Sequence, residues 1–188
     1  MKFFTLEAYH STDDDKMESL EDWGQCYVAY DLHLENMREV LPDSLLEISS
    51  QNTFDDGLVT RVRHDKKKQK LEIRLRCGNL MINYYDMVLT YEGARISAKD
   101  DRMLATIART TTWGKGWKFD CHNHELDVNS NGEIVHRFLF NPGISFEIVC
   151  TSITWKKIPK PGRRLGFARD RYIGGPSEDL ALLKLKKS

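Results

Sequence analysis

The sequence predicts an α+β protein: a curved antiparallel sheet of about six strands, built from two three-strand meanders and packed by an acidic N-terminal amphipathic helix. Two observations support this prediction. Apolar residues recur every three or four positions between residues 17 and 41, which is helical spacing. After Gly57 the spacing changes to every second residue, which is typical of strands with one buried face. We therefore expect a single α+β domain over residues 1–155 and a basic C-terminal extension over residues 156–188.

The helix expected over residues 17–41 has an apolar and an acidic face. Pro42 is expected to end it, because proline cannot continue a helix. The stripe predicted to face the sheet consists of Trp23, Tyr27, Tyr30, Leu34, Met37 and Leu41. Carboxylates on the other face, or before the helix where the dipole favours negative charge, are the candidate partner-binding residues. They are Asp13, Asp14, Asp15, Glu18, Glu21, Asp22 and Glu35. A short helical turn is expected at PDSLLEIS, residues 42–49.

Residues 58–97 predict the first meander. LVTRVRHD (58–65) and KLEIRLRC (70–77) alternate apolar and polar residues on either side of a lysine-rich connection, which predicts a hairpin with one buried face and one basic, exposed face. INYYDMVLTYEGARIS (82–97) continues as one long strand or two short ones. The following DDRMLATIARTT (100–111) predicts a second helix, capped by Asp100 or Asp101.

Residues 117–155 predict the second meander, with strands near 117–128, 133–141 and 144–155. The pair Asn131-Gly132 is favoured in two-residue type I′ hairpin turns, and the tripeptide at 141–143 marks the next turn. A two-residue loop places His136 opposite Asp127, on the face of the sheet away from His122 and His124. A loop of odd length would reverse this arrangement.

The register of this hairpin decides which chemistry its side chains can support. A tetrahedral metal site needs three or four converging ligands, whereas the expected register brings together only His122 and His124 as candidate metal ligands. We therefore favour no metal site and expect no cofactor. Glu125, Asp127 and His136 share a face in this register, so they are candidate catalytic residues of an acid/base enzyme, because a neighbouring carboxylate raises the pKa of a histidine and orients its ring.

Charge is segregated along the chain although the net charge is zero. Residues 1–57 hold 3 Lys/Arg against 14 Asp/Glu, residues 58–155 hold 15 against 11, and residues 156–188 hold 10 against 3. Such asymmetry can steer a charged partner. The C-terminal run interleaves basic residues with Trp155, Phe167 and Tyr172, a mixture suited to phosphate contact and base stacking. An alternative nucleic-acid site therefore consists of Lys156, Lys157, Lys160, Arg163, Arg164, Arg169 and Arg171, before a short terminal helix at SEDLALLKLKK.

Several protein classes are disfavoured by missing motifs. The four cysteines include no CxxC pair and are expected to be free thiols that act as small hydrophobic residues. No P-loop, dinucleotide fingerprint or GxSxG nucleophile elbow is present. Glu7 interrupts the N-terminal apolar run, and the longest later run, at 79–85, is too short to span a bilayer. We expect a cytoplasmic protein that does not contact a membrane.

Three parts of the chain resemble known proteins. They are the start MKFFT, the stretch NTFDDGLVTRVRHDKKKQKLEIRLRC with MVLTYEGARI, and the stretch HELDVNSNGEIVHRFLF with ISFEIVCTSI. These are similar to a group of small uncharacterised bacterial proteins that begin Met-Lys-Phe/Tyr-Phe-Thr, and more loosely to sheet-rich immunity proteins of bacterial toxin systems. The resemblance covers residues 58–155 and the first few residues, and it implies a sheet scaffold that functions by binding.

We therefore expect a non-enzymatic, immunity-like module whose acidic helix face binds a protein, for example a basic one. Two alternatives stay open. One is a metal-dependent or acid/base enzyme centred on the hairpin at 121–136, and the other is nucleic-acid binding through the basic extension.

Overall fold

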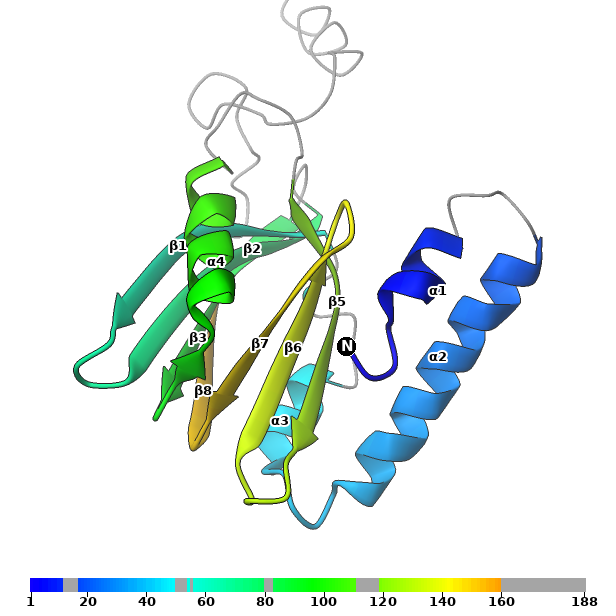
Figure 1. Ribbon diagram of the computed structural model, residues 1–188, viewed down its shortest axis with the longest axis horizontal. Helices are drawn as coiled ribbons and strands as arrows, with labels where there is room; N and C mark the ends of the chain where they lie inside the picture. Colours follow the sequence, from blue (N-terminus) through cyan, green and yellow to red (C-terminus); the bar gives the residue numbers. More distant parts are fainter. Residues whose placement is uncertain (12–16, 50–53, 55, 80–82, 111–118, 160–188) are drawn as a thin grey trace, which may run out of the picture.

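The computed structural model describes residues 1–11, 17–49, 54, 56–79, 83–110 and 119–159. They form one antiparallel sheet of eight strands together with helices on its surfaces (Figure 1). The predicted α+β class and antiparallel sheet are confirmed, whereas the sheet has eight strands instead of about six.

The strand order in the sheet is β4-β7-β6-β5-β1-β2-β3-β8. The helices are α1 (Leu6–Ser11), α2 (Met17–Asn36), α3 (Asp43–Ser49) and α4 (Ala98–Thr110). The strands are β1 (Gly57–Asp65), β2 (Lys70–Asn79), β3 (Asn83–Glu92), β4 (Arg95–Ile96), β5 (Asp120–Val128), β6 (Ile134–Phe140), β7 (Ile144–Cys150) and β8 (Ser152–Pro159).

The two extra strands arise at one corner, where residues 82–97 form two strands, which was one of the expected alternatives, and the single strand expected over residues 144–155 is broken. Residues 82–97 contribute β3 and β4, and residues 144–159 contribute β7 and β8, which pair with opposite ends of the sheet. At the break, the Thr151 N–H donates a 3.0 Å hydrogen bond to the Glu92 carbonyl, and Gly93 takes a φ of +63°. This contact brings the two edges of the sheet close together, so the sheet curls while β4 and β8 remain edge strands among the described pairings.

The first hairpin has the predicted two faces. Leu71, Ile73 and Leu75 of β2 are fully buried, while Arg74 and Arg76 alternate with them on the opposite face. β1 follows the same alternation after an irregularity between Val59 and Arg61. The hairpin therefore has the predicted buried and basic faces, but only the β1 arginines, Arg61 and Arg63, are exposed, while Arg74 and Arg76 are half-buried beside Asp86.

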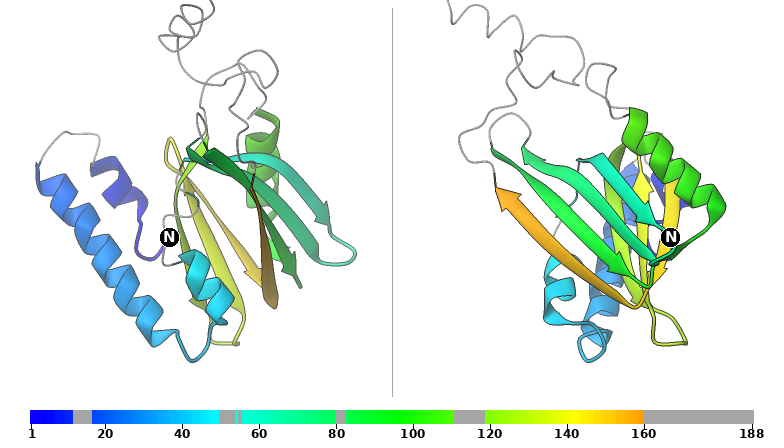
Figure 2. Two further views of the ribbon diagram at one scale, coloured as in Figure 1. Left: turned by 180° about the vertical axis from the view of Figure 1, so that it is seen from behind. Right: turned by 90° about the vertical axis from the view of Figure 1, so that its left-hand side faces the viewer.

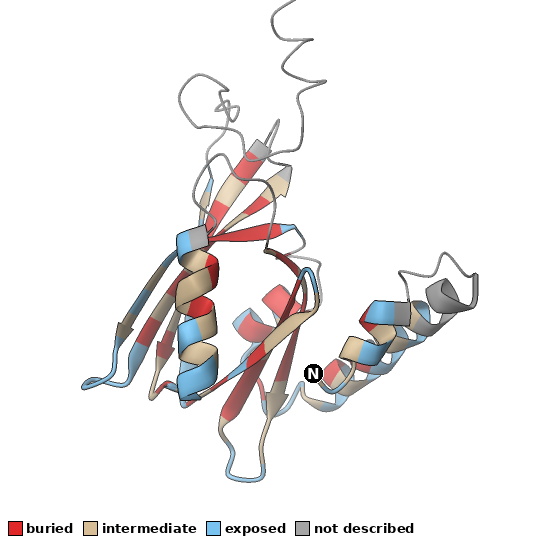
Figure 3. Cartoon of the chain, turned by 45° about the horizontal axis from the view of Figure 1, so that its top comes forward, coloured by how far each residue is buried: buried red, intermediate tan, exposed pale blue. Residues whose placement is uncertain are grey.

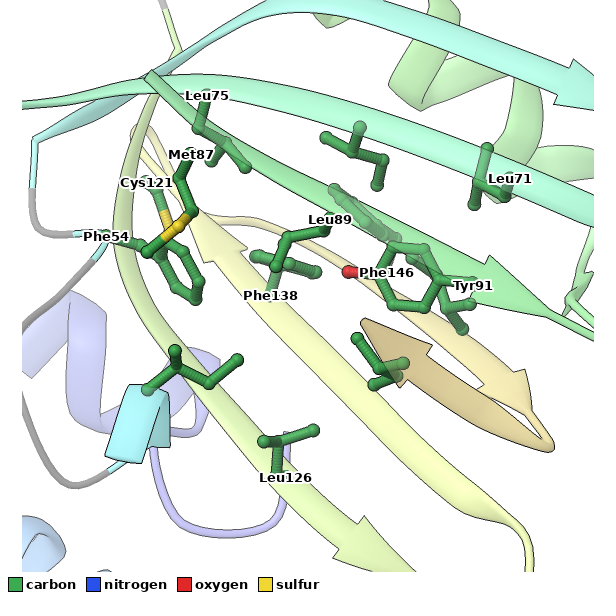
Figure 4. Packing of buried hydrophobic residues seen from close by; sticks show 14 of the residues in the cluster. Phe54, Leu71, Leu75, Met87, Leu89, Tyr91, Cys121, Leu126, Phe138 and Phe146 are labelled. Atoms are coloured by element: carbon green, nitrogen blue, oxygen red, sulfur yellow. The ribbon is translucent and has the colours of Figure 1, made fainter. Parts of the chain in front are cut away.

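The main core fills the inside of the curled sheet (Figure 4). Tyr91 from β3 and Phe138 from β6 lie on opposite sides of this interior, and buried residues of α3 and α4 complete it. α4 contacts β1 and β7, and α3 contacts β5. Figure 3 shows that buried residues gather on the strands, while the β1–β2 and β5–β6 connections are exposed at their tips.

The start of α4 differs in detail from the prediction. The Ser97 hydroxyl, and not Asp100 or Asp101, caps the helix by accepting a 3.0 Å hydrogen bond from the Asp100 N–H. Asp101 instead lies 2.8 Å from His64 Nδ1 and thereby ties α4 to β1.

A second apolar cluster joins the N-terminal helices to Leu139 on the outer face of β6. Tyr30 and Leu34 of the predicted stripe are buried in it, while Leu41 is buried in the main core. The chain before α1 lies between α2 and β5, so Phe4 packs against Tyr30 (Figures 1 and 2). α2 ends at Asn36, before Pro42, because the Met37 N–H bonds the carbonyls of both His33 and Leu34 and the chain tightens into turns.

Cys77, Cys121 and Cys150 are buried free thiols in the main core, and Cys26 is a half-buried free thiol, as expected. Among the described helices, none has the length and apolarity needed to cross a membrane.

Candidate functional sites

The register of the β5–β6 hairpin differs from the expected one. His136 lies opposite Leu126, not Asp127. The reason is the turn: Asn129 Oδ1 accepts hydrogen bonds from the N–H groups of Asn131 and Glu133, and Gly132 takes a φ of +77° while Asn131 does not adopt positive φ. This is a three-residue loop with a glycine bulge instead of a type I′ turn. The odd length reverses the parity and turns His136 toward the core.

His136 consequently meets His124 inside the curled sheet. His124 Nδ1 and His136 Nε2 are 3.2 Å apart, and His136 Nδ1 lies 3.0 Å from the Tyr91 hydroxyl on β3. His124 also hydrogen-bonds the backbone of Ile48, near the C-terminus of α3. That bond favours the protonated ring, so its acceptor is the Ile48 carbonyl, which satisfies one of the unpaired groups at a helix end.

The hydrogen bonds that link Ile48, His124, His136 and Tyr91 are consistent with one assignment of donors and acceptors. His124 uses one nitrogen to donate to the Ile48 carbonyl, so its Nδ1 accepts from His136 Nε2–H, and His136 Nδ1 accepts from the Tyr91 hydroxyl. Both imidazoles are neutral in this arrangement. Burial lowers the pKa of His124 to about 3, and burial and then His124 hold the pKa of His136 well below its usual range. Both rings therefore act as neutral core groups that join α3, β5, β6 and β3.

His122 lies on the other side of β5. Its ring is 5.2 Å from those of Tyr9 and Trp23, whereas the His124 ring is 4.4 Å from Phe54 in the main core. An irregularity in the pairing between Cys121 and Asn123 separates the two histidines. Within the part of the chain that the structure describes, no group of three or more His, Cys, Asp or Glu side chains is placed to hold a metal ion.

Glu125, expected in an acid/base cluster, instead receives the N-terminal segment. Its carboxylate is fully buried and accepts hydrogen bonds from the backbone N–H groups of Lys2, Phe3 and Phe4 at 2.6–3.0 Å. Three successive amides around one carboxylate form an anion-binding concavity. The described contacts therefore give Glu125 a structural role, in which it anchors the segment between α2 and β5.

Asp127 lies on the same outer face, where its histidine neighbour is His33 of α2 and not His136. Asp127 Oδ1 is 3.1 Å from His33 Nε2, and Oδ2 is 3.3 Å from Arg137 and 3.4 Å from Lys2. Burial raises the pKa of Asp127, but the hydrogen bond from Val128 and these positive neighbours outweigh it, so the pKa lies below its usual range. The three expected catalytic residues are thus divided between the two faces of the sheet.

Asp120 is a buried carboxyl that the sequence pattern did not single out. It is 8% exposed, and its Oδ1 has no hydrogen-bond partner within the part of the chain that the structure describes, although the carboxyl hydrogen-bonds its own backbone N–H and Asn141. Burial, and then the charge of Asp56, raise the pKa of Asp120. A carboxyl with a raised pKa can act as a general acid, so Asp120 is the residue at which the enzymatic alternative is best tested.

The outward face of α2 carries an exposed apolar pair. Val28 and Leu32 are each 62% exposed and stand one helical turn apart. Asp31 and Glu35 are exposed beside them, and Glu35 pairs with Arg38 at 2.7 Å. The sequence did contain this signal, because an i, i+4 apolar pair stands outside the buried stripe. We call Val28, Asp31, Leu32 and Glu35 the outer α2 face.

The remaining candidate residues are only partly covered by the structure. Glu18, Glu21 and Asp22 fall within α2, but their side chains are outside the described residues, as are Asp13, Asp14 and Asp15. Lys156 and Lys157 are exposed on β8, and Lys157 Nζ stands 4.1 Å above the Tyr85 ring. Lys160, Arg163, Arg164, Arg169 and Arg171, with the expected terminal helix, also lie outside the described residues.

No protein-family model, curated protein or solved structure matches this chain. The resemblance to small bacterial proteins and to immunity proteins therefore stays a prediction.

Proposed function

We propose that the protein is a non-enzymatic binding module that engages a basic protein partner through the outer α2 face. The observation that carries the proposal is the exposure of Val28 and Leu32, each 62%, between carboxylates. Protein interfaces combine an apolar centre with a polar rim, and the outer α2 face has this composition. Scattered apolar residues need no explanation, but two large ones on adjacent turns of an otherwise polar helix face form a patch.

Charge supplies the partner chemistry. Residues 1–57 carry a net charge of −11, from 3 basic and 14 acidic residues, and α2 belongs to this segment. Complementary charge accelerates encounter and selects partners. An immunity-like role is the specific form of the proposal: the acidic helix occupies the basic active-site cleft of a nuclease toxin.

The first experiment compares three immobilised baits in extract of the producing cells. They are the unchanged protein, the double variant Val28→Lys/Leu32→Lys, and a control, Val40→Lys. Val40 is 57% exposed but lies in the turn beyond α2, so it tests the loss of an exposed apolar residue elsewhere. A basic protein retained by the unchanged bait and the control, and lost from the double variant, is the expected result. Equal retention by all three would refute the proposal.

A second experiment uses the purified partner. The triple reversal Glu18→Lys/Glu21→Lys/Asp22→Lys is expected to lower the association rate and to weaken its dependence on salt, because steering acts on encounter more than on dissociation. An unchanged association rate would mean that these acidic residues form only a solvated helix face and do not contribute to binding. The enzymatic alternative predicts the reverse sensitivity: variants of Glu125, His136 or the adjoining Asp120 would change activity, whereas α2 variants would not.

A further inference from the structure

The outer face of the β1-β2-β3-β8 half of the sheet carries a row of positive charge. Arg61 lies opposite Arg74, Arg74 opposite Val88, and Val88 opposite Lys156, so one row crosses four neighbouring strands. Strands lie about 4.8 Å apart, which makes the row about 14 Å long. We call Arg61, Arg74 and Lys156 the basic row.

Two members of the basic row are available to a ligand. Arg61 and Lys156 are exposed, and neither forms an ion pair with a carboxylate among the described residues. Arg74 is partly neutralised, since its Nε donates a 3.0 Å hydrogen bond to Asp86. Like charges directly opposite each other on a sheet are destabilising, so an anion bound between Arg61 and Arg74 would relieve their repulsion.

The adjoining row adds neutral hydrogen-bond donors. Arg63 lies opposite Glu72, which lies opposite Thr90, and Thr90 lies opposite Thr154. Arg63 Nη1 is 3.9 Å from Glu72, so this pair offers little net charge. Thr90 follows Val88 by two residues and Thr154 precedes Lys156 by two, so both threonines lie on the face of the basic row. Hydroxyls and basic side chains together are the groups that usually bind phosphate oxygens.

We propose that the basic row binds the sugar-phosphate backbone of nucleic acid. A phosphate backbone is a better ligand for this row than acidic side chains, because the strand that carries Lys156 leads into a basic run that also contains Phe167 and Tyr172. That composition combines phosphate contact with base stacking. The proposal does not depend on the role assigned to α2.

The arrangement of the fold keeps the acidic helix away from this face. α2 packs on β5 through Tyr30. The backbone N–H of Leu126 in β5 donates a 2.7 Å hydrogen bond to the Tyr30 hydroxyl. In Figure 2, right, β1, β2, β3 and β8 face the viewer, and the N-terminal helices lie behind the sheet. The described acidic residues of α2 and the basic row therefore lie on different sides of the sheet, and salt further weakens the interaction between such exposed charges.

Fluorescence anisotropy of the full chain with a labelled oligothymidine, and with a duplex of the same length, tests the proposal. Affinity is expected to fall as salt rises. Each single-strand phosphate contact contributes about −0.7 to the slope of log K against log salt, so Arg61→Gln/Lys156→Gln should reduce its magnitude by about 1.4. The same variant should weaken binding at low salt by about tenfold. The form bound more tightly, single strand or duplex, identifies the preferred nucleic acid.

The matched control is Lys67→Gln/Lys68→Gln, which removes the same charge from the β1–β2 connection. It should leave the slope and the affinity unchanged. All four positions are exposed, so melting temperatures should not shift and the comparison does not depend on folding. No binding to either nucleic acid, or equal losses in both double variants, would overturn the proposal. Competition by polyglutamate as effective as that by unlabelled oligothymidine would also overturn it, by identifying the face as a site for acidic proteins.

Discussion

His124 Nδ1 lies 3.2 Å from His136 Nε2, and this contact joins the two strands of a hairpin to opposite walls of the core. His124 reaches the C-terminus of α3 through Ile48, and His136 reaches β3 through Tyr91. A buried polar chain stabilises a fold only when every donor and acceptor is paired. The groups of this chain are all paired only while both imidazoles are neutral, so protonation of either ring should destabilise the fold at low pH.

The first prediction concerns pH. Both histidines have pKa values below their usual 6.5, His124 at about 3, so the unfolded state binds protons that the folded state does not. Stability is then fully present above pH 6.5 and is lost as the pH falls from there toward 3. Each ring should contribute a loss of about 1.4 kcal/mol per pH unit once the pH is well below 6.5.

Urea denaturation at pH 7 and pH 5 measures this loss, in a window where ordinary carboxylates remain ionised. Ring nitrogen NMR shifts provide the control, because the folded protein at pH 5 should retain two neutral imidazoles. Protonation of either buried ring in the folded state at pH 5 would contradict the proposed hydrogen-bond direction.

The second prediction tests Tyr91, at one end of the hydrogen-bond chain that includes His136 and His124. Tyr91→Phe removes the hydroxyl that donates to His136 Nδ1 and leaves a buried acceptor unpaired, so the free energy of unfolding should fall by about 1–3 kcal/mol. Tyr27→Phe is the matched control, since the Tyr27 hydroxyl makes longer contacts of 3.2 and 3.4 Å with Asn123 in a half-buried position. Chemical denaturation should show a larger loss for Tyr91→Phe. Equal losses would mean that the histidine chain adds no specific stability.

The third prediction concerns the anchor of the N-terminal segment. Glu125→Gln places an amide among three backbone donors, so it should lower the free energy of unfolding by about 2 kcal/mol and increase amide hydrogen exchange at residues 2–4. Glu147→Gln is the control, because Glu147 is 47% exposed and pairs with Arg137 on the surface. Its effect should stay within about 0.5 kcal/mol. Unchanged exchange in Glu125→Gln would show that the aromatic contacts of Phe3 and Phe4 suffice to hold the segment.

Local patterns predicted the elements whose cause is local. Alternation in residues 58–77 predicted β1, β2 and their basic face, and the stripe containing Tyr30 and Leu34 predicted the buried face of α2. The hairpin register was wrong because Asn129, outside the expected turn, closes the loop with its own side chain. A difference of one residue in the loop then reversed the faces of every later residue in β6.

The candidate sites depended on contacts that no local pattern contains. Glu125 and the amides that surround it are more than 120 positions apart in sequence, so nothing near Glu125 indicates its ligands. Tyr91 likewise meets His136 only because the sheet curls. Charge segregation, by contrast, was readable throughout, since it requires no contact at all.

The last prediction tests the corner that curls the sheet. Gly93 has a φ of +63°, and a methyl group there would lie 2.7 Å from Thr151 Oγ1. Gly132 has a φ of +77° but no atom within 4 Å of such a methyl group. Gly132→Ala therefore measures the cost of positive φ alone, about 1 kcal/mol, and Gly93→Ala should lower the free energy of unfolding by a further 1–3 kcal/mol, about the cost of overpacking. Thr151→Ser in the Gly93→Ala background removes the Cγ2 atom, 2.8 Å from the same methyl position, and should restore part of the difference. If the two alanine variants were equally stable, the contact between Gly93 and Thr151 would not limit the packing of the corner. The break of both strands would then have to depend on the hydrogen bonds that Thr151 donates to the Glu92 carbonyl.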